Sequence, residues 1–418
     1  MSQLSTEHNA AHAQRKHAVQ HALRLLKSPR LFNEFLVAVT NAGLVGEEAN
    51  ALVLFIVEVS RVLPRPLNLF VKGQSSAGKN WLVTRTLRLM PKGAVAEITS
   101  ASDKAWHYSG SDFRHRVLYV QERNEAAGRT DPIRLLISEK KLVRIVTKYE
   151  HGKLVAKKYV ARGPVAAIST TTKNRLEIDD ETRHLSIWVD ESSSQTRNIV
   201  RSYTASKQHL RQKDLRAWHM IHWLLEQRIA TKIVFPPWFE KIADHLFVDD
   251  LRVRRYFPAF VEACRTVCLI RSFQPHRKRS RNNELEVEFA DFAIAALIFD
   301  RVFVESLHLS KSTGEETRRL VEAIVAENGK AAQVKDVARE LGISLDRAYA
   351  KLRYAKQVGV IRLVNRPEQS NRKTYVAMPR PRFLPDPEKL FQDLEGVKGP
   401  VRFVHPITGE WIVYKRAG

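Results

Sequence analysis

One eight-residue segment offers the clearest chemistry in the chain. It follows the pattern G-x-x-x-x-G-K-[ST] except at its last position, and its residues are Gly73, Gln74, Ser75, Ser76, Ala77, Gly78, Lys79 and Asn80. In this pattern the glycines let backbone N–H groups converge on phosphate oxygens, and the lysine reaches the β- and γ-phosphates. An apolar run precedes the segment and a helical pattern over 81–90 follows it. The segment therefore predicts a site for the phosphates of ATP; the alternative is a glycine-bearing turn with a surface lysine.

Two polar residues that end another apolar run would complete this site. Residues 116–120 are followed by Gln121 and Glu122. ATP-hydrolysing sites of this type carry an aspartate here to order Mg²⁺, and often a glutamate to polarise the attacking water. Glu122 is thus the candidate base, and the candidate metal ligands are two neutral amides, Asn80 and Gln121. Neutral amides at these two positions would impair hydrolysis more than they impair nucleotide binding. The alternative for residues 116–122 is an edge strand with a solvated end and no role in a site.

Alternating segment types around these residues predict an α/β fold. Between residues 67 and 190, continuous apolar runs alternate with helical patterns, as in a mainly parallel sheet that is buried on both faces. Residues 15–62 and 196–310 have a helical pattern. We expect five parts: an N-terminal helical region 1–62, an α/β core 63–195, a helical lid or connecting region 196–310, a winged helix-turn-helix 311–380, and a Pro-rich segment with a terminal hairpin 381–418.

A basic hairpin is predicted within the core, over residues 141–161. Two β-rich segments, 141–149 and 154–161, flank a turn that contains Gly152. The candidate DNA contacts are Lys148, His151, Lys153, Lys157 and Lys158. Lysines of this kind would bind phosphates without reading sequence, and the binding would depend strongly on salt. A solvated hairpin whose charges prevent aggregation is the alternative.

The winged helix-turn-helix is predicted from three helices and two strands within 316–378. On the third helix, which begins at Leu345, the expected buried stripe is Leu345, Ala348, Tyr349, Leu352 and Ala355. The candidate DNA contacts are Arg347 and Lys351 on that helix, and Arg372 and Lys373 in the loop between the strands. A protein-docking module is the alternative.

The composition narrows the possible partners. The chain has 418 residues and a net charge of +24, which favours nucleic acid as a partner and an anionic membrane only second. The longest apolar run, 51–59, is too short to span a bilayer, and no secretory signal is evident, so we expect a cytoplasmic protein without a membrane partner. Cys264 and Cys268 are expected to be buried thiols; a metal-ligand pair is the alternative.

The ordered series of motifs resembles a known family. The phosphate loop is followed by V-L-Y-V-Q-E, the basic hairpin, V-A-A-I-S-T-T-T, and E-T-R-H-L-S-I-W-V-D-E-S. Over about residues 20–200 this series is similar to AAA+ ATPases related to the MCM replicative helicases of bacterial phages and mobile elements. The resemblance implies Lys79 as the phosphate-loop lysine and Glu122 as the catalytic glutamate. It further implies a sensor among Ser169, Thr170 and Thr171 at the end of strand 165–168, with Thr170 as the candidate.

The resemblance also implies an assembly. Arg183 falls where the family's arginine finger acts on the nucleotide of a neighbouring subunit, which implies a homo-oligomeric ring, a hexamer in that family. The alternative for Arg183 is a surface salt bridge with Asp179, Asp180 or Glu181. The resemblance further implies that the hairpin projects into the central pore of the ring and binds DNA there.

Three functions follow from these patterns. The first is a DNA-dependent ATPase, a helicase-like ring motor that uses ATP and Mg²⁺ on single-stranded or forked DNA. The second is a DNA-binding replication initiator or regulator that is switched by nucleotide and hydrolyses it weakly or not at all. The third, a basic RNA- or protein-scaffolding factor, has no specific motif in its favour. No primase zinc cluster is evident, so a primase or initiator would be a separate protein.

Overall fold

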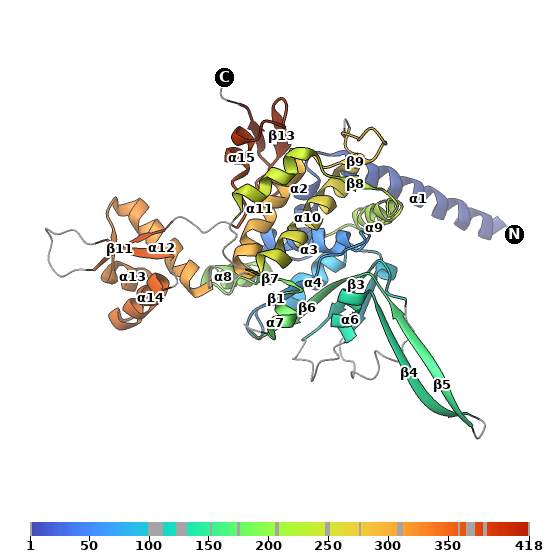
Figure 1. Ribbon diagram of the computed structural model, residues 1–418, viewed down its shortest axis with the longest axis horizontal. Coiled ribbons are helices and arrows are strands. Elements are labelled where there is room, and N and C mark those ends of the chain that lie inside the picture. Colours follow the sequence, from blue (N-terminus) through green and yellow to red (C-terminus); the bar gives the residue numbers. More distant parts are fainter. Residues whose placement is uncertain are drawn as a thin grey trace. The chain divides into compact units, whose positions relative to one another are not determined.

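The computed structural model divides the chain into two compact units (Figure 1). Unit 1 is formed by residues 1–299 together with 385–418, and unit 2 by residues 300–384. The structure describes residues 2–98, 112–122, 132–150, 153–173, 176–204, 209–246, 251–275, 277–306, 312–357, 360–364, 373–378 and 383–416. Because 385–418 packs with unit 1, unit 2 is inserted into the sequence of unit 1 rather than appended to it.

Unit 1 is an α/β unit with many helices. Its α-helices are α1 (Ser2–Lys27), α2 (Leu31–Asn41), α3 (Glu48–Ser60), α4 (Lys79–Leu87), α6 (Pro132–Glu139), α7 (Ile178–Glu181), α8 (Ser193–Thr204), α9 (Gln212–Glu226), α10 (Val253–Ile270) and α15 (Pro387–Asp393). Its 3₁₀ helices are η1 (Lys92–Ala94), η2 (Pro237–His245) and η3 (Arg271–Phe273). Helix α11 (Phe289–Ser306) runs on into unit 2.

The centre of unit 1 is a five-stranded parallel sheet with the order β2-β3-β6-β1-β7. The strands are β2 (Val95–Ile98), β3 (Arg116–Val120), β6 (Val165–Thr171), β1 (Leu69–Lys72) and β7 (Leu185–Trp188). Strands β1 and β6 are buried along their whole length, which explains their continuous apolar runs. The predicted α/β class with a parallel sheet is confirmed.

The parallel order brings the chemically active residues to one edge of the sheet. The carboxyl ends of parallel strands meet at the same edge, where ligands bind in open α/β sheets. The phosphate-loop segment follows β1, Gln121 and Glu122 follow β3, and Asp190 lies just beyond β7. The register aligns Val71 of β1 with Thr170 of β6.

Helices pack against this sheet and against the terminal segments. Helix α3 contacts α10 and α4, and α1 lies along α9. Rings from α2, α3 and α9 form one core cluster, in which Phe35 and Phe55 stack with centroids 4.3 Å apart and Trp218 meets both edge-on. The C-terminal segment contributes to a second cluster, in which the ring centroids of Phe391 and Phe289 are 5.5 Å apart. The remaining strands of unit 1 are β8 (Ile233–Val234), β9 (Leu285–Glu286), β13 (Val401–Val404) and β14 (Trp411–Tyr414).

The predicted basic hairpin is confirmed as a secondary-structure element. Strands β4 (Lys141–Glu150) and β5 (Lys153–Arg162) pair with each other in an antiparallel two-stranded sheet. Their register runs from Lys141 opposite Arg162 to Glu150 opposite Lys153. In Figure 1 this ribbon extends away from the parallel sheet. The chain enters it from α6, which contacts both β4 and β6.

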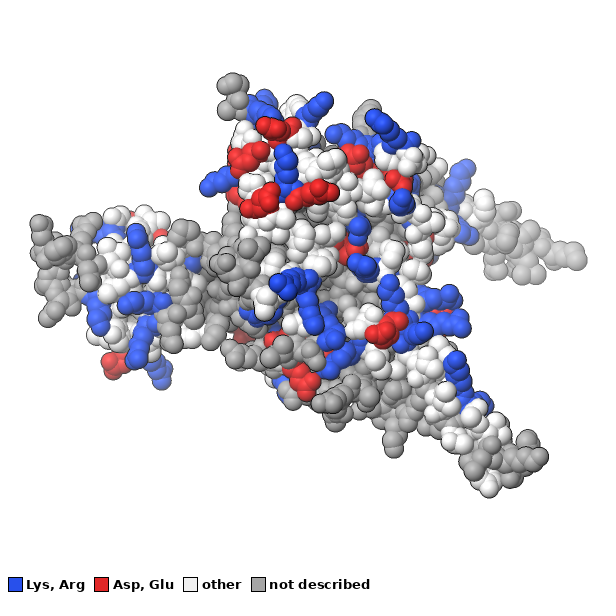
Figure 2. All heavy atoms as spheres, viewed as in Figure 1, with Lys and Arg blue, Asp and Glu red and all other residues white. Residues whose placement is uncertain are grey.

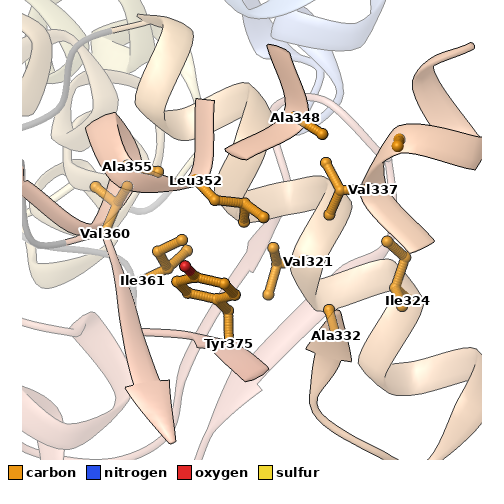
Figure 3. Close-up of a cluster of buried hydrophobic side chains, with 11 residues drawn as sticks. Val321, Ile324, Ala332, Val337, Ala348, Leu352, Ala355, Val360, Ile361 and Tyr375 are labelled. Atoms are coloured by element: carbon orange, nitrogen blue, oxygen red, sulfur yellow. The ribbon is translucent and has the colours of Figure 1, made fainter. Parts of the chain in front are cut away.

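Besides the end of α11, the described residues of unit 2 form three helices and a small antiparallel sheet. Its elements are α12 (Ser312–Asn328), β10 (Ala332–Gln333), α13 (Val334–Leu341), α14 (Leu345–Gln357), β11 (Ile361–Val364) and β12 (Thr374–Ala377), with the sheet order β10-β12-β11. Figure 3 shows its core, where Leu352 of α14 and Val321 of α12 point toward the ring of Tyr375. Gly342 ends α13 with φ +61°, a left-handed conformation that favours glycine.

Several details of the sequence interpretation are wrong. In α14, Ala348, Leu352 and Ala355 are buried as expected, but Leu345 is 58% exposed and Tyr349 37% exposed. Strand β6 does not end at residue 168, and residues 169–171 belong to it. The alternative that β3 is an edge strand is also wrong, because β3 lies between β2 and β6.

Two other expectations concern buried thiols and membranes. Cys264 and Cys268 are free and buried on α10, as expected. Burial raises the pKa of both thiols well above the usual value. Among the residues that the structure describes, no helix combines the length and apolar character needed to span a bilayer.

Candidate nucleotide-binding site

The phosphate-loop segment, residues 73–80, connects β1 directly to α4. Lys79 is the first residue of α4 and is only 7% exposed. Its ammonium group donates hydrogen bonds to the carbonyl oxygens of Gly73 (2.9 Å) and Gln74 (2.6 Å), so the lysine lies inside the curl of its own loop. Burial lowers the pKa of Lys79, while Glu122 and Glu191 oppose that shift. Both carboxylates are therefore close enough to act on this ammonium group.

Two glycines allow the loop to take this shape. Gly78 has φ +90°, a left-handed conformation that side chains rarely adopt. A Cβ atom on Gly73 would come within 2.5 Å of Val189 Cγ2 and 3.0 Å of Glu191 Oε1. The first glycine is thus required by the close approach of the segment after β7, and the second by the turn into α4.

Glu122 is held at the carboxyl end of β3 by a neighbouring strand. Its backbone N–H donates to the Thr170 hydroxyl oxygen at 3.0 Å, and Thr170 is fully buried on β6. Glu122 adopts φ +47°, a left-handed conformation that costs a non-glycine residue about 1–3 kcal/mol and is common at functional sites. Thr170 is thus hydrogen-bonded to the backbone of Glu122, and the Glu122 carboxylate acts on the charge of Lys79. The family resemblance implies roles in hydrolysis for all three residues.

The two predicted metal ligands lie at the same edge of the sheet. Asn80 Oδ1 accepts a hydrogen bond from the hydroxyl of Tyr119 at 3.3 Å, and the Gln121 amide nitrogen donates to Glu97 Oε1 at 2.6 Å. The described residues include no group of three or more His, Cys, Asp or Glu that could hold a metal ion alone. Mg²⁺ prefers oxygen donors and is often held by one or two carboxylates together with substrate phosphates. This oxygen-rich donor set fits an Mg²⁺ that arrives with a triphosphate.

A cleft of about 580 Å³ opens beside the loop. It is lined by residues 74–78 of the loop, by Trp81 and Leu82 of α4, by the 43–47 segment, and by residues of α8. Gln195 of α8 donates to the carbonyl of Val45 at 2.7 Å, which joins two of these walls. Trp81 is 51% exposed and Tyr203 78% exposed, so the cleft offers two aromatic surfaces next to the phosphate-binding loop.

An acidic residue contacts the loop directly. Glu191 Oε1 accepts a hydrogen bond from the backbone N–H of Gln74 at 2.5 Å. This is one of the amides that the motif directs toward phosphate oxygens. A bound phosphate and the Glu191 carboxylate would therefore compete for the same donor.

Arg183 lies outside this cluster. It precedes β7, at the amino end of the strands, while the loop is at the carboxyl end. Its guanidinium Nε donates to the Ser138 hydroxyl at 3.1 Å. Of the acids named as its alternative partners, Asp180 pairs with Arg134 and Glu181 with Lys72. Arg183 lies near Pro66 and Asn68, which precede β1, and so at the other end of the strands from the loop of its own chain.

The predicted DNA contacts lie on the hairpin and on unit 2. Lys157 and Lys158 are exposed, and adjacent strand residues point to opposite faces of the ribbon. Figure 2 shows Lys and Arg side chains along the described part of this hairpin. His151 lies outside the described residues, and for Lys148 and Lys153 only the backbone is described.

On unit 2, the third helix presents cations at its surface. Arg347 is exposed on α14, and Lys351 is partly exposed one turn later. Lys373 donates to the hydroxyl of Tyr349 at 2.6 Å, with its ammonium 4.7 Å from the centre of that ring. Arg372 lies outside the described residues.

The solved structures that resemble this chain include two distant likenesses. No protein-family model matches the chain. No curated protein sequence matches it. A putative ATPase from Cytophaga hutchinsonii aligns at 12% identity with a TM-score of 0.36, over 68% of this chain and 87% of its own. A full-length MCM homolog from Methanopyrus kandleri aligns at 13% identity with a TM-score of 0.40, over 69% of this chain and 62% of its own.

Both TM-scores lie below 0.5, so neither likeness carries an assignment for this chain. The site is assigned from its own strand order, the conformation of its loop and the position of Lys79. The alignment also spans less than two thirds of the MCM homolog.

Four residues at the site were not identified from the sequence. Tyr119 lies within the predicted apolar run of β3, whereas Glu97 lies in β2, a strand that the sequence interpretation did not predict; a glutamate within the run 95–98 is a usable signal. Trp81 directly follows the motif, and Glu191 follows the last strand of the sheet. Their roles depend on which strands are neighbours, and periodicity does not supply that information.

Proposed function

We propose that this chain is an AAA+ ATPase that acts on DNA as a homo-oligomeric ring. The observation that carries the proposal is the placement of Lys79, which lies within a loop that joins a central parallel strand to a helix N-terminus. That arrangement provides converging amides, a fixed positive charge and a helix dipole at one point. A nucleoside triphosphate is the ligand that uses all three.

Each residue near the loop has a distinct proposed role. Lys79 binds the β- and γ-phosphates, and Glu122 orients and deprotonates the attacking water. Thr170 fixes the backbone of Glu122 through their hydrogen bond. When bound, Mg²⁺ would neutralise charge on the phosphate oxygens, and Asn80 and Gln121 are the side chains that would hold it.

Arg183 is proposed to act on the nucleotide of a neighbouring subunit. It lies at the opposite edge of the sheet from its own loop, which is incompatible with action on its own nucleotide. A guanidinium supplied by a neighbour meets the charge that grows on the transferred phosphoryl group. This role requires a closed ring, for which we propose a hexamer.

The basic elements are proposed to bind DNA through its phosphates. Lys157 and Lys158 of the hairpin would contact the strand that passes through the ring. Unit 2 has the element order of a winged helix, with α14 as the helix that presents Arg347 and Lys351. Replication of a phage or mobile element is the process we propose, with a separate primase or initiator as partner.

One observation favours a second candidate function. Asn80 and Gln121 are uncharged and already hydrogen-bonded to other side chains, which would slow hydrolysis. The chain would then be a DNA-binding replication initiator or regulator in which nucleotide switches assembly.

A hydrolysis assay separates the two functions. Phosphate release is measured with and without single-stranded DNA for the wild type, Lys79→Ala and Glu122→Gln. The motor proposal expects DNA-stimulated release that both variants lose. Nucleotide binding without DNA-stimulated release would favour the switch. Salt-insensitive or absent DNA binding would refute both.

A further inference from the structure

Three side chains converge on one face of the sheet beside Asn80. Tyr119, the next-to-last residue of β3, is fully buried, and its hydroxyl lies 3.3 Å from Asn80 Oδ1. Strand register aligns Glu97 of β2 with Tyr119, and Gln121 follows two residues later. Because Glu97 and Tyr119 are register partners on neighbouring strands, their side chains point to the same face. The side chain of Gln121, in the turn just after β3, reaches Glu97 on this face through a hydrogen bond. This is the face on which the N-terminus of α4 presents Asn80.

Glu97 makes a direct contact with Gln121. Its carboxylate accepts a hydrogen bond from the Gln121 amide nitrogen at 2.6 Å. An amide bonded through its nitrogen turns its oxygen away from that partner, so Glu97 determines which way the Gln121 oxygen points. The Glu97 carboxylate, which is hydrogen-bonded to the side chain of residue 121, also supplies the negative charge that an aspartate at position 121 would have carried.

Strand register connects Glu97 to Asn80 through Tyr119. Glu97 of β2 lies opposite Tyr119 of β3. The Tyr119 hydroxyl donates a hydrogen bond to Asn80 Oδ1 at 3.3 Å. The Glu97 carboxylate is therefore placed on the strand next to the residue that contacts Asn80.

We propose that Glu97 is the residue through which this site anchors magnesium. Glu97 orients the Gln121 amide and supplies the charge, while Asn80 and Gln121 provide neutral oxygens. Residues that hold a metal ligand in place commonly change metal affinity by about 10–100-fold when they are replaced. The inference rests on the proposed nucleotide site, and it assigns a role to a residue in a strand that carries no recognised motif.

The test measures how strongly Mg²⁺ improves nucleotide binding. A fluorescent ADP analogue, mant-ADP, is titrated into the full-length protein with Mg²⁺ in excess over the nucleotide and, separately, with EDTA. The ratio of the two dissociation constants is compared for four proteins: wild type, Glu97→Gln, the charge-returning double variant Glu97→Gln with Gln121→Asp, and Glu388→Gln. Glu97 and Glu388 are both exposed, and Glu388 on α15 is the matched control.

The expected outcome is specific to the metal. Mg²⁺ should tighten binding by wild type and by Glu388→Gln by about 10-fold or more, and by Glu97→Gln by less than about 3-fold. The double variant should recover most of the wild-type ratio, and all four proteins should bind similarly in EDTA. A wild-type ratio near one, or an unchanged ratio in Glu97→Gln, would overturn the role of Glu97. Absence of mant-ADP binding by wild type under both conditions would instead refute the proposed nucleotide site.

Discussion

Glu191 should weaken nucleotide binding, because its carboxylate accepts a hydrogen bond from the Gln74 N–H group, which a bound phosphate would also need as a donor. Its oxygen accepts the Gln74 N–H at 2.5 Å, and its charge acts on Lys79. A phosphate that binds the Gln74 N–H must first break its exposed hydrogen bond to Glu191, which costs about 1 kcal/mol of binding free energy. Repulsion between a phosphate and a carboxylate about 5 Å apart, at an effective dielectric constant of about 60, adds roughly 1 kcal/mol. The two terms together correspond to about 30-fold in affinity.

Two substitutions separate these terms. Glu191→Ala removes both and should tighten ADP binding by about 30-fold, whereas Glu191→Gln keeps an acceptor for Gln74 and should tighten it by about 5-fold. Isothermal titration with ADP in EDTA measures both values, and Glu388→Gln serves as the control. Only the charge term should shrink as salt is added. Unchanged or weaker binding in both variants would refute this reasoning.

Four further predictions concern catalysis, DNA and stability. Glu122→Gln should lower phosphate release by about 100-fold or more while nucleotide affinity stays within about 3-fold, measured by turnover and titration. Replacing Lys157 and Lys158 together by alanine should reduce the slope of log affinity for single-stranded DNA against log salt by about 1.4. Burial raises the pKa of Glu58 to about 8. The folded state therefore holds that proton more tightly than the unfolded chain does. As the pH rises from about 5 to 8, unit 1 should lose roughly 3 kcal/mol of its free energy of unfolding. Glu58→Gln should flatten the fall in melting temperature over that pH range. Phe391→Ala should destabilise unit 1 by about 3–5 kcal/mol in thermal melts, because Phe391 is fully buried against the ring of Phe289.

The sequence predicted the local parts of this fold well. The loop between β1 and α4, the hairpin and the helices of unit 2 were found because glycines, alternating residues and apolar periodicity act over a few positions. The errors come from burial. Leu345 and Tyr349 have the helical spacing of a buried stripe, but they lie near the start of α14, where no other described element covers them well enough to bury them.

The candidate site was only partly predictable. Motif spacing selected Lys79 and Glu122, and the structure brings both to one edge of the sheet. Glu97, Tyr119 and Glu191 reach that edge through strand neighbours that are far apart in sequence. The insertion of unit 2 into unit 1 likewise depends on where 385–418 packs, which local patterns cannot show.

Nucleotide affinity of the loop is the measurement that decides most. Calorimetric titration of the wild type and Lys79→Ala with a non-hydrolysable ATP analogue should show saturable one-to-one binding, weakened about 30-fold or more by loss of the ammonium group. Equal affinities in the two proteins, or no heat of binding in either, would contradict the assignment of residues 73–80 as a phosphate site.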